Sequence, residues 1–226
     1  MSVTRIYPIR CPQCAVEFEI ELYDSINRAE NPELREALLE NRVNAATCSS
    51  CSFAFRVDKN LLYHDPEARF MVYWNAAGEL KPSEAQREFQ ILLSALPPGK
   101  ADLPALYLVL SRIELVERIF LLEAGLEPRL IEYIKHLVHS NNRAKVDPAF
   151  KRILFNAKDS TDELLFFVVQ DVKSGRLEQT LTYSRKAYRA LAEMFDRDDK
   201  TPSLMELFPG PVINARQLLS EPPEKS

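Results

Sequence analysis

The chain has 226 residues, of which 46% are apolar and 27% charged, the ordinary balance of a globular protein with a buried core. Its 29 basic and 33 acidic side chains give a net charge of −4, so the strong positive field of a general nucleic-acid binder is missing. The five glycines are scattered and form no phosphate-binding loop, dinucleotide-binding turn or nucleophile elbow. These observations argue against nucleotide-binding enzymes of those kinds and against serine hydrolases.

The N-terminal segment lacks the apolar core of a signal peptide, because Arg5, Pro8 and Arg10 interrupt it. The longest apolar runs, 105–110 and 164–169, are far shorter than the roughly 20 residues of a membrane-spanning helix. We therefore expect a cytoplasmic protein that does not enter the membrane. In such a reducing compartment, closely spaced cysteine pairs more often bind metal or do redox chemistry than form stable disulfides.

In the N-terminal part, β-type composition and alternation of apolar with charged residues predict strands. The predicted strands cover residues 3–9, 16–22, 53–57 and 69–74. Asn31 followed by Pro32 is a typical helix start, and the apolar stripe behind it ends near Leu39. A cysteine pair precedes a strand at Cys11 and again at Cys48, so the same unit occurs twice.

Helical periodicity dominates the middle of the chain. One helix is expected to begin at Ser83, which forms a capping box with Gln86, and a second covers residues from 113 to a C-terminal cap at Gly125. Pro128 opens a third, so the last two form a helical hairpin. Residues 105–110 fit either a buried strand or a helix start, since periodicity does not distinguish the two.

Near Phe150 the sequence pattern changes from helical periodicity to short apolar segments. Three short apolar segments separated by turn-forming residues predict a β-meander over residues 153–155, 164–169 and 177–183. Ser184 can cap a helix that follows the last of these strands. The final residues, 220–226, are polar and proline-rich, and we expect them to be disordered.

The four cysteines carry the strongest functional signal. They form two C-x-x-C pairs with none left over, and the candidate metal ligands are Cys11, Cys14, Cys48 and Cys51. Two such turns brought together supply a tetrahedral set of four thiolates for one Zn²⁺. The 33 residues between the pairs exceed the roughly 15–20 of a compact site, and the helix near residue 32 explains the excess as an insertion. A closed thiolate shell leaves no position for substrate, so the zinc is expected to stabilise the fold.

Two other interpretations of the cysteines stay open from the sequence. Cys11-Pro12-Gln13-Cys14 after a strand is similar to a glutaredoxin active site, but there the pair opens a helix, whereas residues 16–20 here have strand patterning. Four cysteines are also the ligand set of an iron or iron–sulfur centre.

The cysteine motifs and their surroundings resemble the CpXC family of bacterial and archaeal proteins. The resemblance rests on Cys11-Pro12-Gln13-Cys14, the acidic strand behind it, Asn31-Pro32-Glu33-Leu34-Arg35, and Cys48-Ser49-Ser50-Cys51 before an aromatic strand. It covers about residues 5–75, with similarity to longer members over 113–135. The chain departs from the pattern at Ser49, where proline is expected, and Ala15 and Ser52 stand where many cysteine turns carry glycine. The resemblance implies zinc and a bacterial cytoplasmic setting, with no established biochemical activity.

Histidines offer weaker candidate sites. His136 and His139 are three residues apart near a predicted helix end and can share a metal, although imidazoles there also suit the helix dipole. His64 and Asp65 can form an acid/base pair, but neighbours on an extended chain point to opposite faces, so a turn formed with Pro66 is favoured.

Charged and aromatic residues suggest two further sites. The acidic residues of the helical hairpin can form a carboxylate site, yet mixed charges at helical spacing indicate an ion-paired, solvated surface. The residues concerned are Glu114, Glu117, Glu123, Glu127 and Glu132 with Arg112, Arg118, Arg129 and Lys135. Tyr73 and Trp74 beside Arg69 can stack on bases, but strand aromatics mostly belong to the core.

We expect an α+β protein composed of a zinc-ribbon-like antiparallel β module with a helical insertion, a helical hairpin, and a small β-meander plus helix. The expected division is a zinc-ribbon-like domain over 1–80, a helical region over 81–146, an α+β region over 147–219 and the tail. The predicted function is a non-catalytic adaptor with one structural Zn²⁺ and a protein partner. A nucleic-acid-binding zinc ribbon, and an enzyme with its site in the helical or C-terminal part, are the alternatives. Oligomeric state and partner identity do not follow from the sequence.

Overall fold

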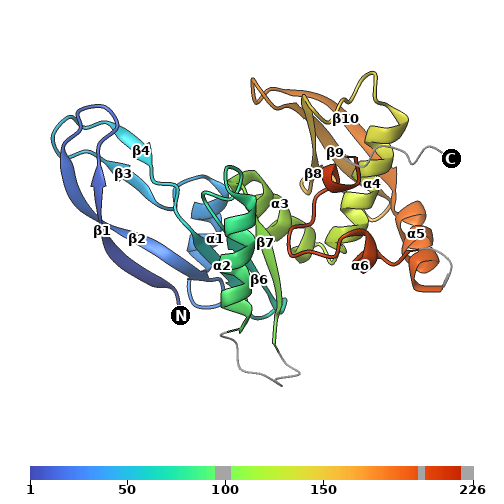
Figure 1. Ribbon diagram of the computed structural model, residues 1–226, viewed down its shortest axis with the longest axis horizontal. Coiled ribbons are helices and arrows are strands. Elements are labelled where there is room, and N and C mark those ends of the chain that lie inside the picture. Colours follow the sequence, from blue (N-terminus) through green and yellow to red (C-terminus); the bar gives the residue numbers. More distant parts are fainter. Residues whose placement is uncertain (95–102, 198–201, 220–226) are drawn as a thin grey trace. The chain divides into compact units, whose positions relative to one another are not determined.

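The computed structural model describes residues 1–94, 103–197 and 202–219. Over these residues the protein is a mixed α+β structure with three sheets and seven helices (Figure 1). The chain divides into two compact units, Met1–Val116 and Glu117–Ser226. We call them unit 1 and unit 2 and describe each by itself. The finer division at residues 80 and 146 stays a prediction.

A five-stranded sheet forms the body of unit 1, with strand order β1-β2-β5-β6-β7. The strands are β1 (Val3–Arg10), β2 (Glu17–Asn27), β5 (Leu61–Asp65), β6 (Phe70–Trp74) and β7 (Ala105–Val109). β1–β2 and β5–β6 pair antiparallel, while β2–β5 and β6–β7 pair parallel. The sheet is therefore mixed and not antiparallel throughout as expected, and each of its two parallel pairs needs a crossover connection.

The crossovers contain the remaining elements of unit 1. Between β2 and β5 lie α1 (Pro32–Leu39) and a two-stranded antiparallel sheet of β3 (Ala45–Thr47) and β4 (Ala54–Arg56). Between β6 and β7 lies α2 (Pro82–Ser94). Alternate residues of β5 and β6 are buried, including Tyr63, Val72 and Trp74, as expected for strands with one face against a core.

Unit 2 combines helices with an antiparallel sheet of order β10-β9-β8. The sheet strands are β8 (Lys151–Asn156), β9 (Leu164–Asp171) and β10 (Leu177–Ser184). Helix α3 (Arg112–Glu123) runs into this unit and is followed by α4 (Pro128–Asn141), α5 (Arg185–Arg197), α6 (Leu204–Leu207) and α7 (Arg216–Leu219). One face of α4 and alternate residues of β8 and β9 form a single apolar cluster, with α5 packed partly against it.

Several local expectations are confirmed. The C-terminal strands form a meander, and the Lys186 N–H donates to the Ser184 hydroxyl at the start of α5. Gly125 has φ +65 and follows α3, where the Leu126 N–H donates to the Leu121 carbonyl. That bond and the left-handed glycine are the signature of a glycine helix cap.

Other expectations are wrong or incomplete. β2 extends to Asn27, five residues beyond the predicted end. His64 and Asp65 do not lie in a turn, because they are the last two residues of β5. The helix expected to be capped by Ser83 begins one residue earlier, at Pro82. Residues 105–109 are a strand, since they pair with β6 along its whole length.

No helix among the described residues is both long and apolar enough to cross a membrane. The tail predicted to be disordered, 220–226, lies outside the described residues.

Candidate metal centre

Each cysteine pair sits in a turn that closes a β-hairpin of unit 1. The first turn joins β1 to β2, and the Cys11 N–H donates to the Val16 carbonyl at 2.9 Å. The Ala15 N–H donates to the Cys11 carbonyl at 3.0 Å, and the Gln13 N–H points at the Cys11 sulfur at 3.4 Å. The turn therefore fixes the cysteine by hydrogen bonds on both of its backbone groups.

The second turn, between β3 and β4, repeats this pattern. The Cys48 N–H donates to the Phe53 carbonyl at 2.9 Å, and the Ser52 N–H donates to the Cys48 carbonyl at 2.9 Å. Ala15 and Ser52 occupy equivalent positions and both have left-handed backbones, with φ of 60 and 59. Glycine adopts this conformation without strain. Ala15 and Ser52 thus stand at positions where the turn favours glycine.

A buried asparagine holds the second hairpin beside the first. The Asn44 side chain accepts from the Tyr23 N–H at 2.8 Å and donates to the Tyr23 carbonyl at 3.1 Å. Its own backbone carbonyl accepts from the Val57 N–H at 2.9 Å. Asn44 therefore ties β2 to the strand pair β3–β4, and sequence analysis did not identify it.

The four cysteine sulfurs converge. Cys11 Sγ lies 3.7 Å from Cys51 Sγ, and Cys14 Sγ lies 3.5 Å from Cys48 Sγ. All four ligand atoms lie within 4.8 Å of one another. Both short distances join one turn to the other, and they exceed the roughly 2.05 Å of a disulfide, so the cysteines are free thiols in one four-membered cluster.

The cluster fits a metal ion with four sulfur ligands. Zn–S bonds of about 2.3 Å in a tetrahedron place sulfur atoms about 3.8 Å apart, close to the separations found here. Cys11 and Cys48 are buried, at 2% and 1% exposure, while Cys51 is half-buried and Cys14 exposed. The four residues of the cluster are those predicted from the sequence, and they form a plausible metal site.

The thiols perturb one another's protonation. The backbone N–H groups of Cys51 and Ser50 help to lower the pKa of Cys48 to about 6, although burial opposes this effect. For Cys51, the Phe53 N–H lowers the pKa, but burial and the neighbouring cysteine sulfurs raise it to about 12. Four thiolates this close repel each other, and a bound cation removes that repulsion by replacing the protons.

Local structure disfavours the glutaredoxin-like interpretation. A low-pKa redox cysteine of that kind sits at a helix N-terminus. Cys14 is followed instead by β2, and Cys51 by β4. Neither pair opens a helix, as the strand patterning predicted.

We call residues 9–20 and 44–57 the cysteine end of unit 1. Its buried residues are few, namely Cys11, Asn44, Ala46 and Cys48. Its aromatic rings form a half-exposed group in which Phe55 stacks on Phe53 at 6.1 Å and meets Phe18 edge-on at 6.4 Å. Phe53 is 40% exposed. This end therefore has little apolar core of its own.

His139, Asp65 and Trp74, which belong to other candidate sites, are buried in the fold. Among the described residues, no other group of three or more histidine, cysteine or acidic side chains converges as a metal site. His139 is buried with Nδ1 at 2.8 Å from the Val146 carbonyl. Asp65 is buried, pairs with Arg28 and accepts from the Ala68 N–H at 3.0 Å. Trp74 is only 3% exposed, so it does not offer a stacking surface for bases.

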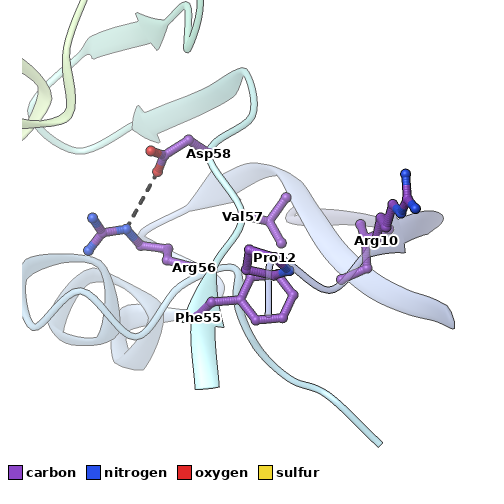
Figure 2. A pocket seen from close by; sticks show the side chains of 7 residues that line it. Arg10, Pro12, Phe55, Arg56, Val57 and Asp58 are labelled. Atoms are coloured by element: carbon purple, nitrogen blue, oxygen red, sulfur yellow. Dashed lines mark ion pairs between the residues drawn. The ribbon is translucent and has the colours of Figure 1, made fainter. Parts of the chain in front are cut away.

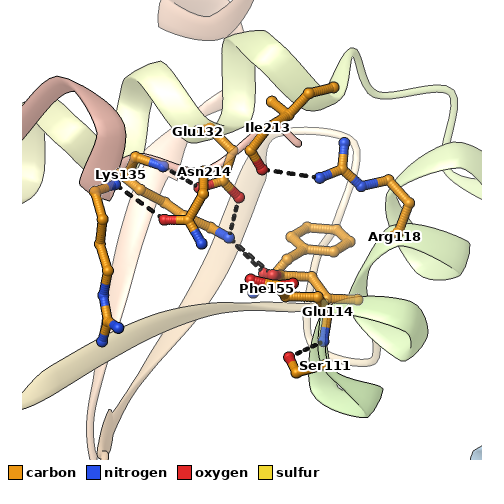
Figure 3. Close-up of polar contacts among 11 residues, drawn as sticks. Ser111, Glu114, Arg118, Glu132, Lys135, Phe155, Ile213 and Asn214 are labelled. Atoms are coloured by element: carbon orange, nitrogen blue, oxygen red, sulfur yellow. Dashed lines mark hydrogen bonds and ion pairs between the residues drawn. The ribbon is translucent and has the colours of Figure 1, made fainter. Parts of the chain in front are cut away.

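The expectation of a solvated charged surface on the helical hairpin is wrong for four residues: Glu117, Arg118, Glu132 and Lys135 are buried. The Lys135 ammonium donates to both oxygens of Glu117 at 2.8 and 2.9 Å and to Glu132 at 2.6 Å (Figure 3). Glu117 also accepts from the Phe155 N–H at 2.5 Å, and Glu132 from the Ala215 N–H at 2.8 Å.

These bonds occupy the three protons of the Lys135 ammonium and every oxygen of the two carboxylates. The Arg118 guanidinium donates to the Ile213 carbonyl at 3.2 Å and ties α3 to the same C-terminal segment (Figure 3). Buried charges are tolerated when they are paired and hydrogen-bonded in this way. The group therefore joins α3, α4, β8 and the residues before α7 as a structural element of unit 2.

Comparison with known protein families identifies the family to which the two cysteine turns belong. The CpXC protein family matches residues 9–135, which is more than half of the chain and includes both cysteine turns. Neither the curated proteins nor the solved structures include a match to the chain. With its two cysteine turns assembled into one four-sulfur cluster, the chain belongs to the CpXC family.

Proposed function

We propose that Cys11, Cys14, Cys48 and Cys51 bind one Zn²⁺ and that this ion stabilises a zinc-ribbon-like module. The observation that carries the proposal is the convergence of four sulfurs from two hairpin turns within 4.8 Å of one another. The repeated turn geometry at Cys11 and Cys48 supports it, because each turn directs two sulfurs to a common point.

The proposed zinc is structural. Four protein thiolates complete a tetrahedral shell, whereas catalytic zinc sites keep a position open for water or substrate. The thiolate set also favours zinc over hard cations such as Mg²⁺ or Ca²⁺, which prefer oxygen ligands.

We further propose that the protein acts through a protein partner rather than by catalysis. Support comes from the cysteine end, which exposes apolar side chains such as Val16 and Phe53, both 40% exposed. Aromatic residues exposed on a rigid scaffold are typical of protein interfaces. In the helical region, the carboxylates of Glu117 and Glu132 are occupied inside unit 2 and are not presented to a substrate.

Metal content tests this proposal. The full chain is purified under reducing conditions, its metals are measured by elemental mass spectrometry, and it is melted with and without a chelator. We expect one zinc per chain and a melting temperature that falls on chelation. Cys48→Ser should lose the zinc, while Ser49→Ala, at the exposed neighbouring position, should retain it. A metal-free chain with four titratable thiols and unchanged melting would refute the zinc site, and iron in place of zinc would refute the identity of the metal.

A further inference from the structure

A surface depression of about 380 Å³ that is wide open to solvent, called the cavity below, lies at the cysteine end, and none of the cysteines lines it. Its lining residues come from the end of β1, the first cysteine turn and the segment of β4: Ile9, Arg10, Pro12, Phe55, Arg56, Val57 and Asp58. Because the cavity is open to solvent, it suits a segment that lies along the surface better than a small molecule enclosed on all sides.

The floor of the cavity is apolar and held in place. Pro12, Phe55 and Val57 group together in Figure 2. The Phe55 ring contacts Phe53 on one side and Phe18 on another, so its orientation is fixed before anything binds. A preorganised apolar floor of this kind suits one large apolar side chain, because little side-chain entropy is lost on binding.

The rim of the cavity carries two guanidinium groups and one carboxylate, Asp58. Figure 2 shows the guanidinium groups of Arg10 and Arg56 on opposite sides of the apolar floor. Arg56 pairs with Asp58 at 3.5 Å, an exposed and therefore weak ion pair. Arg10 donates to the Ala15 carbonyl at 3.1 Å and lies opposite Glu17 across the strand pair.

A third arginine interacts electrostatically with Arg56. Arg112, which does not line the cavity, feels both Arg56 and Asp58: burial lowers the pKa of Arg112, Arg56 lowers it further and Asp58 raises it. The whole chain has a net charge of −4. The cavity lining nevertheless has one more cationic than anionic side chain, and this local excess favours a ligand that carries negative charge.

Strand geometry indicates the form of the ligand. β4 has one partner strand, β3, in the described sheets. On the β3 side, the Phe53 carbonyl accepts a hydrogen bond from the Cys48 N–H, and the Val57 N–H donates to the Asn44 carbonyl. Because successive residues of a strand turn their backbone groups to opposite edges, those of Ala54 and Arg56 face away from β3. An extended peptide can add to that edge by backbone hydrogen bonds.

We propose that this cavity binds an extended acidic segment of a partner protein. An apolar side chain of the segment fills the floor, and carboxylates on either side of it pair with Arg10 and Arg56. This inference rests on the proposed interaction role and names the chemistry of the partner. It also links the surface to the zinc, because Pro12 lies within the first cysteine turn and Phe55 follows the second.

The test uses the zinc-loaded full chain and a displayed library of random 12-residue peptides. Peptides with an aromatic or aliphatic residue between acidic residues should be enriched. The best of them, synthesised with a fluorophore, should bind Arg56→Glu at least tenfold more weakly. Arg42→Glu is the matched control, since Arg42 is likewise exposed and paired with a carboxylate two residues away, and it should bind as the unmodified chain does. Arg56→Ala is measured alongside, because it removes the cation without placing a carboxylate beside Asp58.

Three results would overturn the inference: no enriched peptide, enrichment of basic peptides, or binding that Arg56→Glu leaves unchanged. Binding of a fluorescent 15-residue oligouridine in place of the peptides would reassign the cavity to single-stranded nucleic acid. Zinc is measured in every sample, so the two proposals fail separately. A zinc-loaded chain without peptide binding refutes the cavity alone, and peptide binding by a chain that holds no zinc refutes the metal centre alone.

Discussion

The cysteine end of unit 1 and the core of unit 2 reach an ordered structure by different means. Unit 2 packs eleven buried apolar side chains from α3, α4, β8, β9 and their connections into one cluster. The cysteine end consists of two hairpin ends whose buried residues are two cysteines, Asn44 and Ala46. Isolated two-stranded hairpins are marginally stable in water. Under the proposed metal binding, a metal cross-link takes the place of a core at the cysteine end, as in small metal-stabilised modules.

The largest expected effect comes from removing a cysteine ligand. Cys48→Ser should abolish zinc binding and unfold the cysteine end, since structural zinc sites contribute on the order of 10–16 kcal/mol of apparent binding free energy. Hydrogen exchange should show loss of amide protection in residues 9–20 and 44–57, with the amides of β8 and β9 unchanged. Loss of protection in both units to the same degree would contradict independent stabilisation.

Unit 2 can be destabilised by a substitution that does not affect zinc binding. Lys135→Met removes the cation between Glu117 and Glu132 and leaves two buried carboxylates without it. Removing one partner of a buried ion pair destabilises a protein by about 3–5 kcal/mol, so the unfolding free energy of unit 2 should fall by that amount. Denaturant unfolding measures it, and Lys158→Met, at an exposed position of the same unit, is the control. An unchanged unfolding free energy would show that the buried group is not needed for stability.

Acid should destabilise unit 2 through His139. Burial lowers the pKa of His139 below its usual 6.5, although the contact with the Val146 carbonyl opposes the effect. Below about pH 6.5 the unfolded chain takes up a proton that the folded chain does not, so stability falls as the pH is lowered from 6.5 to the folded pKa. His139→Gln should therefore reduce the slope of melting temperature against pH between 7.5 and 5. An identical slope in both proteins would contradict this assignment.

The smallest expected effect is a gain in stability at the cysteine turns. Ala15 has φ 60, which costs a residue with a side chain about 1–2 kcal/mol, and glycine avoids that strain at a smaller entropic cost. Ala15→Gly should stabilise the zinc-loaded protein by about 0.5 kcal/mol. Ala54→Gly, in the strand β4, is the control and should destabilise by a similar amount. Stabilisation by both changes would show that the turn conformation is not the cause.

Local features of the fold could be predicted because they leave local patterns. The C-x-x-C spacing of the four cysteines identifies them as candidate ligands, and alternation of apolar and charged residues identifies strands such as 16–22. The parallel pairing of β2 with β5 could not be predicted, because it joins distant segments through a long crossover. β5 was not predicted as a strand, because it is short and ends in His64 and Asp65, whose composition is typical of a turn.

The buried ionic group could not be recognised from charge spacing alone, because Glu132 and Lys135 at three residues apart look like an ordinary surface pair. A usable signal was present. Lys135 lies four residues after Ile131 and next to Ile134, both buried, so it belongs to the apolar face of α4. A charged side chain on an apolar helix face needs a buried partner of opposite charge, and for Lys135 this partner is Glu117 on α3.

X-ray absorption at the zinc edge of the purified full chain is the most direct probe of the proposed structural zinc ion and its four thiolate ligands. We expect the spectrum to show a shell of four sulfur atoms at about 2.3 Å with no nitrogen or oxygen neighbour. A mixed shell of sulfur with nitrogen or oxygen, or zinc below one equivalent in a folded chain, would contradict it.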